Sequence, residues 1–389
     1  LVRAGYIHKE MAGVYDFLPL GLRTLNKIIT IIREEMNAIG GEEVFLSTLQ
    51  DPAPWKKSGR WDDTVIDIWF KTHLKNGSEL GLGNTHEEAL TALMTEHISS
   101  YKDLPQYVYQ FQNKFRNETR AKSGIMRTRE FIMKDLYSFS VDSASHDAFY
   151  EKVAIAYELI FKRVGIGDKT YRTFASGGSF SKYSHEYQTV CAAGEDIIYI
   201  DEEKRLALNK EVYDDEEVYA ATGIHKETLK EVKAIEVGNI FTLGTRFSDA
   251  LGLSYKDEEG KPKPVCMGSY GIGPARLMGT IVELLSDEKG LVWPESIAPF
   301  AVHLVSLGKP GDEVSKAADA LYSDMVNAGI EVLYDDRDNS TGQKFAESDL
   351  LGIPKRIVVG RDAVATGAFE VVSRATGEVV KKPRAELFA

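Results

Sequence analysis

Two short segments about a third of the way along the chain carry residue types that could together bind a nucleotide. They read Phe115-Arg116-Asn117-Glu118 and Arg127-Thr128-Arg129-Glu130-Phe131. Side chains two and four apart in a strand share a face, so Arg116 would lie beside Glu118, and Arg127 beside Phe131 and Asp135. Guanidinium groups bind phosphate, a carboxylate accepts from an adenine amino group, and an aromatic ring stacks on a base. Strands paired across residues 119–126 would therefore suit ATP, although a surface hairpin with cross-strand ion pairs accounts for the same residues.

A glycine-rich segment follows later in the chain. Gly268, Gly271 and Gly273 stand in the order G-x-x-G-x-G, with Pro274 and Arg276 directly after them. Glycines let a backbone approach a ligand closely, and proline suits the first turn of a helix. The spacing fits neither a dinucleotide-binding fingerprint nor a P-loop. Either this is a nucleotide site that Arg276 covers, or it is a turn that packs a helix closely on a strand.

Two further segments are weaker candidates when each is taken alone. Thr85-His86-Glu87-Glu88 fits a helix capping box formed by Thr85 and Glu88, which would leave Glu87 free to face a cleft. His185 follows the pair Gly177-Gly178, and a lone histidine is more often structural than functional. The eight histidines show no metal-ligand spacing, and no Ser/His/Asp triad is legible.

Composition limits the class of protein that can carry these segments. The 389 residues suggest two or three domains, and 43% hydrophobic with 27% charged residues is typical of a folded chain. No apolar run is long enough for a membrane span or a signal peptide. The two cysteines indicate a reducing, cytoplasmic compartment and are too few for a cysteine-rich zinc site. The net charge of −12 disfavours a DNA-coating protein, but residues 114–134 form a basic segment that could bind an anion.

Hydrophobic periodicity predicts the elements that position these residues. Helices are expected over 21–38, 86–98, 145–164 and 274–285. Strands are expected over 43–46, 65–70, 107–111 and 265–267, with a glycine turn after the last of them. Residues 190–236 read as a short, mostly polar insertion with an acidic surface.

A composition change around 293–299 indicates a linker to a second domain. Beyond it, strands are expected over 301–306, 331–334, 356–359 and 370–373, and helices over 313–328 and 343–351. Alternating strands and helices of this length predict a small α/β domain with some parallel pairing.

Taken in order, the motifs resemble class II aminoacyl-tRNA synthetases and, within them, bacterial-type prolyl-tRNA synthetases. The resemblance covers nearly the whole chain. The matching segments include 13–21, 58–61, 85–88, 115–118 with 127–135, 235–245, 267–276, 335–337 and 342–354. It implies an α/β chain with an antiparallel catalytic sheet over residues 1–298 and an anticodon-binding domain over 299–389.

The resemblance also implies substrates and residue roles. The substrates would be ATP with Mg²⁺, L-proline and tRNA(Pro), in a homodimer without DNA or membrane partners. ATP would be bound by Arg116, Glu118, Arg127, Phe131, Gly271, Gly273 and Arg276, with the three arginines catalytic and no metal site made by protein groups alone. Proline would be bound by Thr85, Glu87, Arg116 and His185. Arg337 and Lys344 are the expected tRNA contacts, because they are basic and lie near the ends of expected elements.

Three departures from the family pattern limit what it implies. Ser47 stands where motif 1 has proline, which weakens the dimer expectation. The motif 2 loop reads Arg120-Ala121-Lys122-Ser123 instead of Arg-Pro-Arg-Phe, which affects acceptor-end contacts. Residues 190–236 replace a large editing domain, which predicts a short form. A synthetase for threonine or glycine, and a non-catalytic paralogue that binds RNA, stay open; the retained motif arginines argue against the paralogue.

Overall fold

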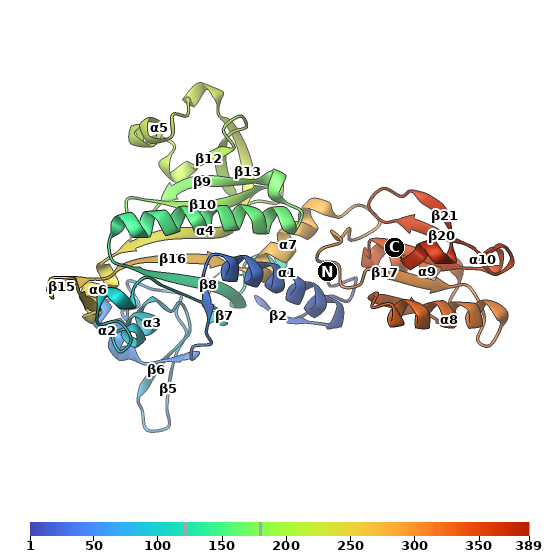
Figure 1. The fold of residues 1–389 in the computed structure, drawn as a ribbon, viewed down its shortest axis with the longest axis horizontal. Helices are drawn as coiled ribbons and strands as arrows, with labels where there is room; N and C mark the ends of the chain where they lie inside the picture. The colour runs from blue at the N-terminus through green and yellow to red at the C-terminus, as the bar shows by residue number, and fades with distance from the viewer. Residues whose placement is uncertain (120, 122, 179–180, 389) are drawn as a thin grey trace. The chain divides into compact units, whose positions relative to one another are not determined.

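The computed structural model describes residues 1–119, 121, 123–178 and 181–388. Contacts group the chain into two compact units. The large unit comprises Lys9–Tyr15 and Ile29–Thr280. The small unit comprises Leu1–His8, Asp16–Ile28 and Ile281–Ala389. Figure 1 shows the ribbon and its element labels, which are used below.

A nine-stranded sheet forms the large unit. Its strand order is β10-β9-β12-β11-β13-β16-β8-β7-β3. The strands are β3 (Glu42–Glu43), β7 (Gln106–Phe115), β8 (Glu130–Ser140), β9 (Thr170–Ser176), β10 (Tyr183–Val190), β11 (Asp196–Asp201), β12 (Leu206–Asn209), β13 (Lys230–Gly244) and β16 (Cys266–Ile272). Only the β3–β7 and β12–β9 neighbours among these described strands are parallel. The expectation of an antiparallel sheet with helices is confirmed.

Helix α4 (Ser143–Arg163) lies across β16 and β8 (Figure 1). Asp142 caps it by accepting from the Ser145 amide at 2.8 Å. Phe149, Val153 and Tyr157 recur at four-residue steps and are all buried, so the helix packs its apolar stripe on the sheet. The helix predicted over 145–164 is confirmed.

Shorter elements surround this sheet. The helices are α2 (Pro52–Ser58), α3 (Glu87–Met94) and α6 (Arg246–Leu251), with 3₁₀ turns η1 (Tyr101–Asp103), η2 (Gly124–Met126) and η3 (Gly167–Lys169). The small sheets are β4 (Leu49–Gln50), β6 (Glu79–Leu82) and β5 (Lys71–His73), and β14 (Ser254–Lys256) with β15 (Pro262–Pro264). The strand predicted over 65–70 is wrong, because the ladder with β6 begins at Lys71 and Trp69 forms only an isolated bridge, to Arg116.

Residues 190–236 fold onto the large sheet instead of forming only a polar surface segment. β11 pairs with β12 and with the first part of β13, while β12 runs beside β9. Ile198 and Ile200 are buried, two residues apart on one face of β11. Helix α5 (Glu216–Thr222), η4 (Lys210–Val212) and η5 (Lys226–Thr228) surround a separate cluster of apolar side chains. Acidic residues are frequent in this segment, so its composition does not indicate the two-residue alternation of buried side chains in β11.

The predicted glycine turn is also corrected by the structure. Gly268 and Gly271 lie inside β16, which pairs with β13 on one side and β8 on the other. A central strand bonded on both sides takes extended backbone, and small side chains let it pass close to its neighbours. Helix α7 (Pro274–Leu285) then begins and ends as predicted.

The small unit is an α/β sandwich. Its sheet has the order β18-β17-β19-β20-β21, in which β17 (Val302–Ser306) is parallel to β18 (Val332–Asp335) and β19 (Lys355–Val359). The remaining elements are β20 (Ala368–Ser373), β21 (Val379–Pro383), α8 (Glu313–Asn327), α9 (Thr341–Leu351), α10 (Arg361–Thr366) and η6 (Arg384–Phe388). The expected α/β pattern with parallel pairing is confirmed.

The N-terminal elements are a β1 (Ile7–Met11) and β2 (Val14–Phe17) hairpin and α1 (Pro19–Ala38). Within the small unit, the Tyr6 hydroxyl donates to the Leu351 carbonyl at 2.7 Å and accepts from Trp293 Nε1 at 2.9 Å. None of the described helices is both long and apolar enough to cross a bilayer.

Candidate active site

The loop that joins β7 to β8 carries the arginines of the first sequence motif. The ladder between the two strands ends at Phe115 and Glu130. Arg116, Glu118 and Arg127 therefore lie in the connecting loop. The two predicted strands do pair, but the prediction that their ladder includes these three residues is wrong. In this loop Arg127 Nε donates to the Glu118 carboxylate at 3.0 Å. Arg120 and Lys122 of the same loop lie outside the described residues.

A cavity of about 650 Å³, partly open to solvent, lies between this loop, β13, β16 and α7. All of the residues predicted to bind ATP line it: Arg116, Glu118, Arg127, Phe131, Gly271, Gly273 and Arg276. Glu236 and Asn239 of β13 line it as well, although no role was predicted for them.

Arg276 connects three walls of this cavity from the first turn of α7. Its Nε donates to the Met126 carbonyl at 2.9 Å, and its Nη1 donates to the Glu236 carbonyl at 3.2 Å. The Glu236 carboxylate lies 3.4 Å from the same Nη1. These contacts fix the guanidinium between η2 and β13, so it is positioned before any ligand arrives.

Arg116 is the second fixed cation of the cavity. Burial and the nearby Arg276 guanidinium lower the pKa of Arg116 from its usual value, although arginine stays protonated. Its guanidinium also lies 5.3 Å from the centre of the Phe131 ring. Two like charges in one partly desolvated cavity repel each other, so an anion that binds between them is stabilised.

Gly271 forms part of the cavity where β13 meets β16. A Cβ atom on Gly271 would lie 2.9 Å from Asn239 Oδ1, closer than a real side chain allows. Asn239 in turn donates from Nδ2 to Glu236 Oε1 at 2.9 Å. Glycine at this position therefore preserves the arrangement of the polar groups on the cavity wall.

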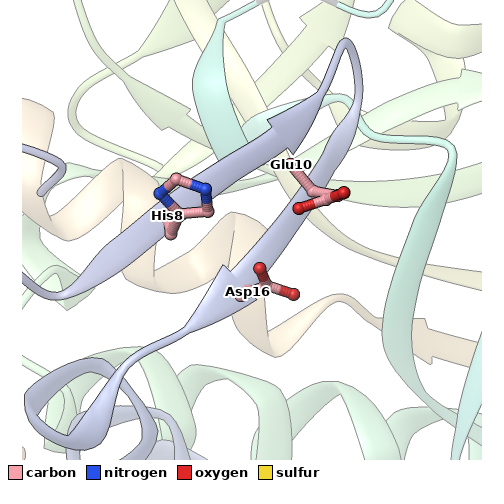
Figure 2. Close-up of side chains that lie close together, drawn as sticks. All are labelled: His8, Glu10 and Asp16. Carbon is pink, nitrogen blue, oxygen red and sulfur yellow. The ribbon is translucent and has the colours of Figure 1, made fainter.

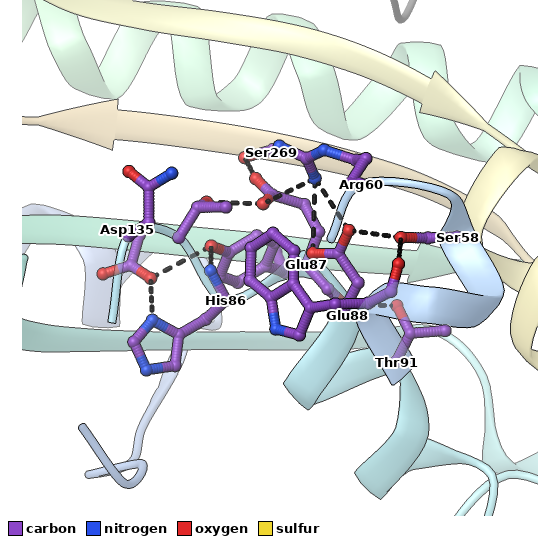
Figure 3. A network of polar contacts seen from close by, with 12 residues as sticks. Ser58, Arg60, His86, Glu87, Glu88, Thr91, Asp135 and Ser269 are labelled. Carbon is purple, nitrogen blue, oxygen red and sulfur yellow. Dashed lines mark hydrogen bonds and ion pairs between the residues drawn. The ribbon is translucent and has the colours of Figure 1, made fainter. Parts of the chain in front are cut away.

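A second polar cluster lies at the start of α3 (Figure 3). The Thr85 hydroxyl donates to Glu87 Oε2, and the Ser269 hydroxyl donates to Glu87 Oε1 at 3.2 Å. Asn84 joins this cluster to the cavity, because Arg116 Nε donates to its Oδ1 at 3.1 Å. The predicted Thr85, Glu87 and Arg116 are thus brought together, and Ser269 and Asn84 are additions from the structure.

The capping box predicted for Thr85 and Glu88 is wrong. Helix α3 has His86 at its N-cap position, and no side chain caps it. The Glu88 carboxylate instead accepts from Ser58 at 2.8 Å and from Arg60 Nη1 at 3.0 Å. Both partners belong to the matched segment 58–61, which suggested the family but no role.

Buried charged side chains of β7 and β8 are connected to this cluster. The Lys114 ammonium lies 2.8 Å from the Asp135 carboxylate, and both side chains are almost fully buried. The Tyr137 hydroxyl donates to Asp135 at 3.0 Å and accepts from the His86 amide at 3.2 Å. Burial lowers the pKa of His86 to about 4, so this imidazole is neutral near pH 7. The start of α3 is consequently bonded to β8, the strand that carries Phe131 of the residues predicted to bind ATP.

His185 lies in β10, where its surroundings are aromatic. Its Nδ1 is 2.7 Å from the Tyr150 hydroxyl, and its ring meets Phe174 edge-on at 4.3 Å. Burial lowers the pKa of His185 to about 3. These contacts explain how the ring is held, but they do not connect it to Thr85 or Glu87.

The two residues predicted to contact tRNA occupy different environments. Arg337 is about half exposed and bonds to Asp335 and Glu347. Lys344 is 1% exposed, and its ammonium donates to the Ser306 carbonyl at 2.6 Å. The expectation for Lys344 is therefore corrected: its charge is used inside the small unit, where RNA cannot reach it.

One hairpin gathers groups of the kind that bind metal ions. His8, Glu10 and Asp16 have their ligand atoms within 4.8 Å of one another, and all are exposed (Figure 2). Exposed acidic groups commonly lie together without an ion, so this cluster supports no metal assignment by itself.

Comparisons with known proteins agree with this geometry. The family model for the tRNA synthetase class II core domain (G, H, P, S and T) matches residues 70–284, and that for the anticodon binding domain matches 301–389. A proline–tRNA ligase from Methylobacterium sp. is 38% identical over 97% of this chain and 90% of the relative, and one from Zymomonas mobilis is 39% identical with the same coverage. The prolyl-tRNA synthetase of Cryptosporidium parvum, crystallised with L-proline and AMP, matches the fold with a TM-score of 0.80 at 17% identity, covering 100% of this chain and 72% of that one. This chain belongs to the proline–tRNA ligase family of class II aminoacyl-tRNA synthetases.

Proposed function

We propose that the chain activates L-proline with ATP to form prolyl-adenylate and transfers the prolyl group to the 3′ end of tRNA(Pro). The observation that supports this proposal is the position of Arg116 between the cavity and the polar cluster at the start of α3. This guanidinium lines the cavity with the nucleotide residues and bonds to Asn84, next to Thr85 and Glu87. A carboxylate held at one cluster would therefore meet a phosphate held at the other.

ATP occupies the cavity in this proposal. Glu118 accepts from the adenine amino group, while Phe131 and Arg276 lie on the two faces of the base. Arg127 contacts the β- and γ-phosphates, and its present partner Glu118 lies on the same loop at 3.0 Å. Arg127 is about half exposed, so it can exchange an exposed ion pair of small net value for a phosphate contact.

Proline binds at the start of α3. Its secondary ammonium group has two N–H donors and a positive charge, which suit the Glu87 carboxylate and the Thr85 hydroxyl oxygen. Its carboxylate then faces Arg116, which bridges it to the α-phosphate. His185 is proposed to line the same pocket on the family pattern alone.

The reaction is an in-line attack of the proline carboxylate oxygen on the α-phosphate, with pyrophosphate leaving. The nucleophile is already anionic, so no general base is required. Arg116 stabilises charge that develops on the α-phosphoryl oxygens, and Arg127 stabilises charge on the departing pyrophosphate. Because Arg116 is already fixed by Asn84, it needs no reorganisation during the reaction.

Mg²⁺ is expected to accompany ATP, and the cavity contains groups that fit it. Hard cations prefer carboxylate and amide oxygens, and Glu236 and Asn239 offer both within the cavity wall. These two residues would hold the ion, which would neutralise phosphate charge when bound.

The two parts of the chain have different roles in this proposal. Residues 1–298 form the catalytic part and 299–389 the anticodon-binding part, with Arg337 as the remaining tRNA candidate. Residues 190–236 take the place of an editing domain; the Methylobacterium relative matches over 90% of its own length, which leaves little room there for a large extra domain.

A homodimer in the cytoplasm completes the proposal. In the motif 1 region, Phe45 is 80% exposed and Leu49 is 55% exposed, although both are apolar. Exposed apolar side chains beside a short edge strand suit a protein interface. Cys191 and Cys266 are both free thiols, which suits a reducing compartment.

ATP–pyrophosphate exchange measured with each of the twenty amino acids tests the proposed function. Exchange should be greatest with proline. Stronger exchange with threonine or glycine would overturn the substrate assignment, and no exchange with any amino acid would identify a non-catalytic paralogue.

A further inference from the structure

Two neighbouring carboxylates at the start of α3 share one guanidinium. Arg60 Nη1 lies 3.0 Å and 3.2 Å from the two oxygens of Glu88 and 3.6 Å from Glu87 Oε2 (Figure 3). The side chain of Glu88 is fully buried, while those of Glu87 and Arg60 keep 7% and 11% of their exposure. Arg60 is therefore closer to the carboxylate that no substrate can reach.

The structure holds Arg60 in this place on several sides. Its guanidinium lies 5.3 Å from the Trp55 ring and 5.4 Å from the Phe247 ring. Ser58 donates to the same Glu88 oxygen that Arg60 contacts. Aromatic faces favour a cation but supply no anion, and of the two neighbouring carboxylates Glu88 lies nearer to the guanidinium than Glu87 does.

The net charge of the group formed by Glu87, Glu88 and Arg60 depends on Glu88. With both carboxylates ionised, Glu87, Glu88 and Arg60 together carry one negative charge in excess. Without the charge of Glu88, these three residues together would be neutral, and Arg60 would pair with Glu87 instead. A cationic substrate would then have to displace an arginine, and it would gain little from a neutral site.

We propose that Glu88 is a positioning residue that binds Arg60 and so keeps the Glu87 carboxylate available for the secondary ammonium group of proline. This inference rests on the proposed function, because it assumes that Glu87 receives proline. Glu88 itself touches no substrate and acts through Arg60.

The variant Glu88→Gln tests this role, since glutamine keeps the shape and removes the charge. At saturating ATP, the KM for proline in pyrophosphate exchange should rise at least tenfold, while kcat and the KM for ATP change less than threefold. Calorimetric titration of the variant with L-proline should show the same loss in affinity. Glu88→Asp keeps the charge and should stay within a few-fold of the unaltered protein.

The double variant Arg60→Gln/Glu88→Gln separates positioning from a structural role. Removing both charges leaves Glu87 without a competing cation, so proline affinity should recover most of what Glu88→Gln lost. A double variant that is as impaired as Glu88→Gln or worse would overturn the proposal.

A second comparison tests the same role if the first variant does not fold. If Glu88→Gln alone fails to fold, the comparison of Arg60→Gln with the double variant serves instead: without Arg60, removing the Glu88 charge should leave the KM for proline unchanged, and a further rise of tenfold would refute the role. The unaltered protein must exchange pyrophosphate with proline; if it does not, the proposed function fails, whereas normal exchange with an unaffected Glu88→Gln variant defeats only this inference.

Discussion

Asn84 holds Arg116 where the two candidate substrate sites meet, with the arginine Nε donating to the amide Oδ1 at 3.1 Å. Asn84 directly precedes the Thr85–Glu87 cluster, and Arg116 lines the cavity proposed for ATP. One side chain therefore reaches both sites, which makes it the most sensitive position for adenylate formation.

Arg116→Ala should abolish adenylate formation while the fold stays intact. A fixed bidentate phosphate contact that strengthens in the transition state is worth ~3 kcal/mol or more, so pyrophosphate exchange should fall at least a hundredfold. Arg163→Ala is a suitable control, because it removes an exposed ion pair with Glu34 and Glu35 on the same unit. Near-normal exchange in Arg116→Ala would show that the motif is misplaced.

Gly271→Ala should weaken ATP binding more than Gly273→Ala does. The new methyl group at Gly271 would collide with Asn239 Oδ1, whereas at Gly273 it would meet Arg276 Cβ at an ordinary 3.5 Å. We expect the KM for ATP to rise about tenfold in the first variant, on the order of 1.4 kcal/mol, and less than threefold in the second. Equal effects would mean that the Asn239 wall does not contact the nucleotide.

The KM for proline should rise as the pH falls from 8 to 6. Burial raises the pKa of Glu88 to about 7, with Arg60 opposing and Glu87 adding to the shift. A raised pKa means that Glu88 is neutral below about pH 7 and ionised above it, so acid releases Arg60 toward Glu87. The ammonium group of proline stays protonated throughout this range.

The Glu88→Gln variant is the control for this pH dependence and should show a nearly flat profile at an elevated KM. ATP must be saturating, because burial and the neighbouring Glu236 carboxylate also raise the pKa of Glu186 to about 7 near the nucleotide cavity. A profile that keeps its full slope in Glu88→Gln would assign the titration to another group.

Lys344→Met and Arg337→Ala should fail in different assays. Removing the buried Lys344 ammonium takes a donor away from the Ser306 carbonyl, and Asp335 loses a cation at 3.9 Å. The free energy of unfolding in urea should fall by about 2–4 kcal/mol. Arg337→Ala removes the nearest cation from the buried Asp335 carboxylate and should cost about 1–3 kcal/mol, but it should also raise the KM for tRNA in aminoacylation, with pyrophosphate exchange unaffected. A stable Lys344→Met protein with poor tRNA affinity would reverse these roles.

Alanyl-tRNA(Pro) should persist in the presence of the purified protein. A pocket for the proline ring admits alanine, and each missing methylene is worth only ~1–3 kcal/mol, so some mischarging is expected. The segment from β11 to α5 adds strands to the large sheet, and its acidic run includes Asp214 and Glu217, which are strongly exposed and would repel the acceptor end. Hydrolysis of preformed alanyl-tRNA(Pro) faster than in buffer would contradict this.

Local patterns in the sequence were sufficient for many of the elements. The apolar stripe of 145–164, the proline at the start of 274–285 and the alternation after residue 300 each depend on neighbours within a few positions, and each predicts the observed element. Seven of the residues that line the cavity were also predicted, through the resemblance of the ordered motifs to the family, whereas Glu236 and Asn239 were not. Where a local rule failed, as with the glycine turn, pairing on both sides of β16 imposed strand geometry that composition does not show.

The sequence by itself determined the family through the order of its motifs, the seven residues expected to bind ATP through that resemblance, and the alternation of helices and strands through short-range periodicity. Only the tertiary structure decided which charges face each other. Arg60 and Glu88 are 28 positions apart, and Lys344 is buried against a strand 38 positions away. Ion pairing depends on distances of a few ångströms between side chains brought together by strand register and helix packing, and burial then sets how strongly each charge acts.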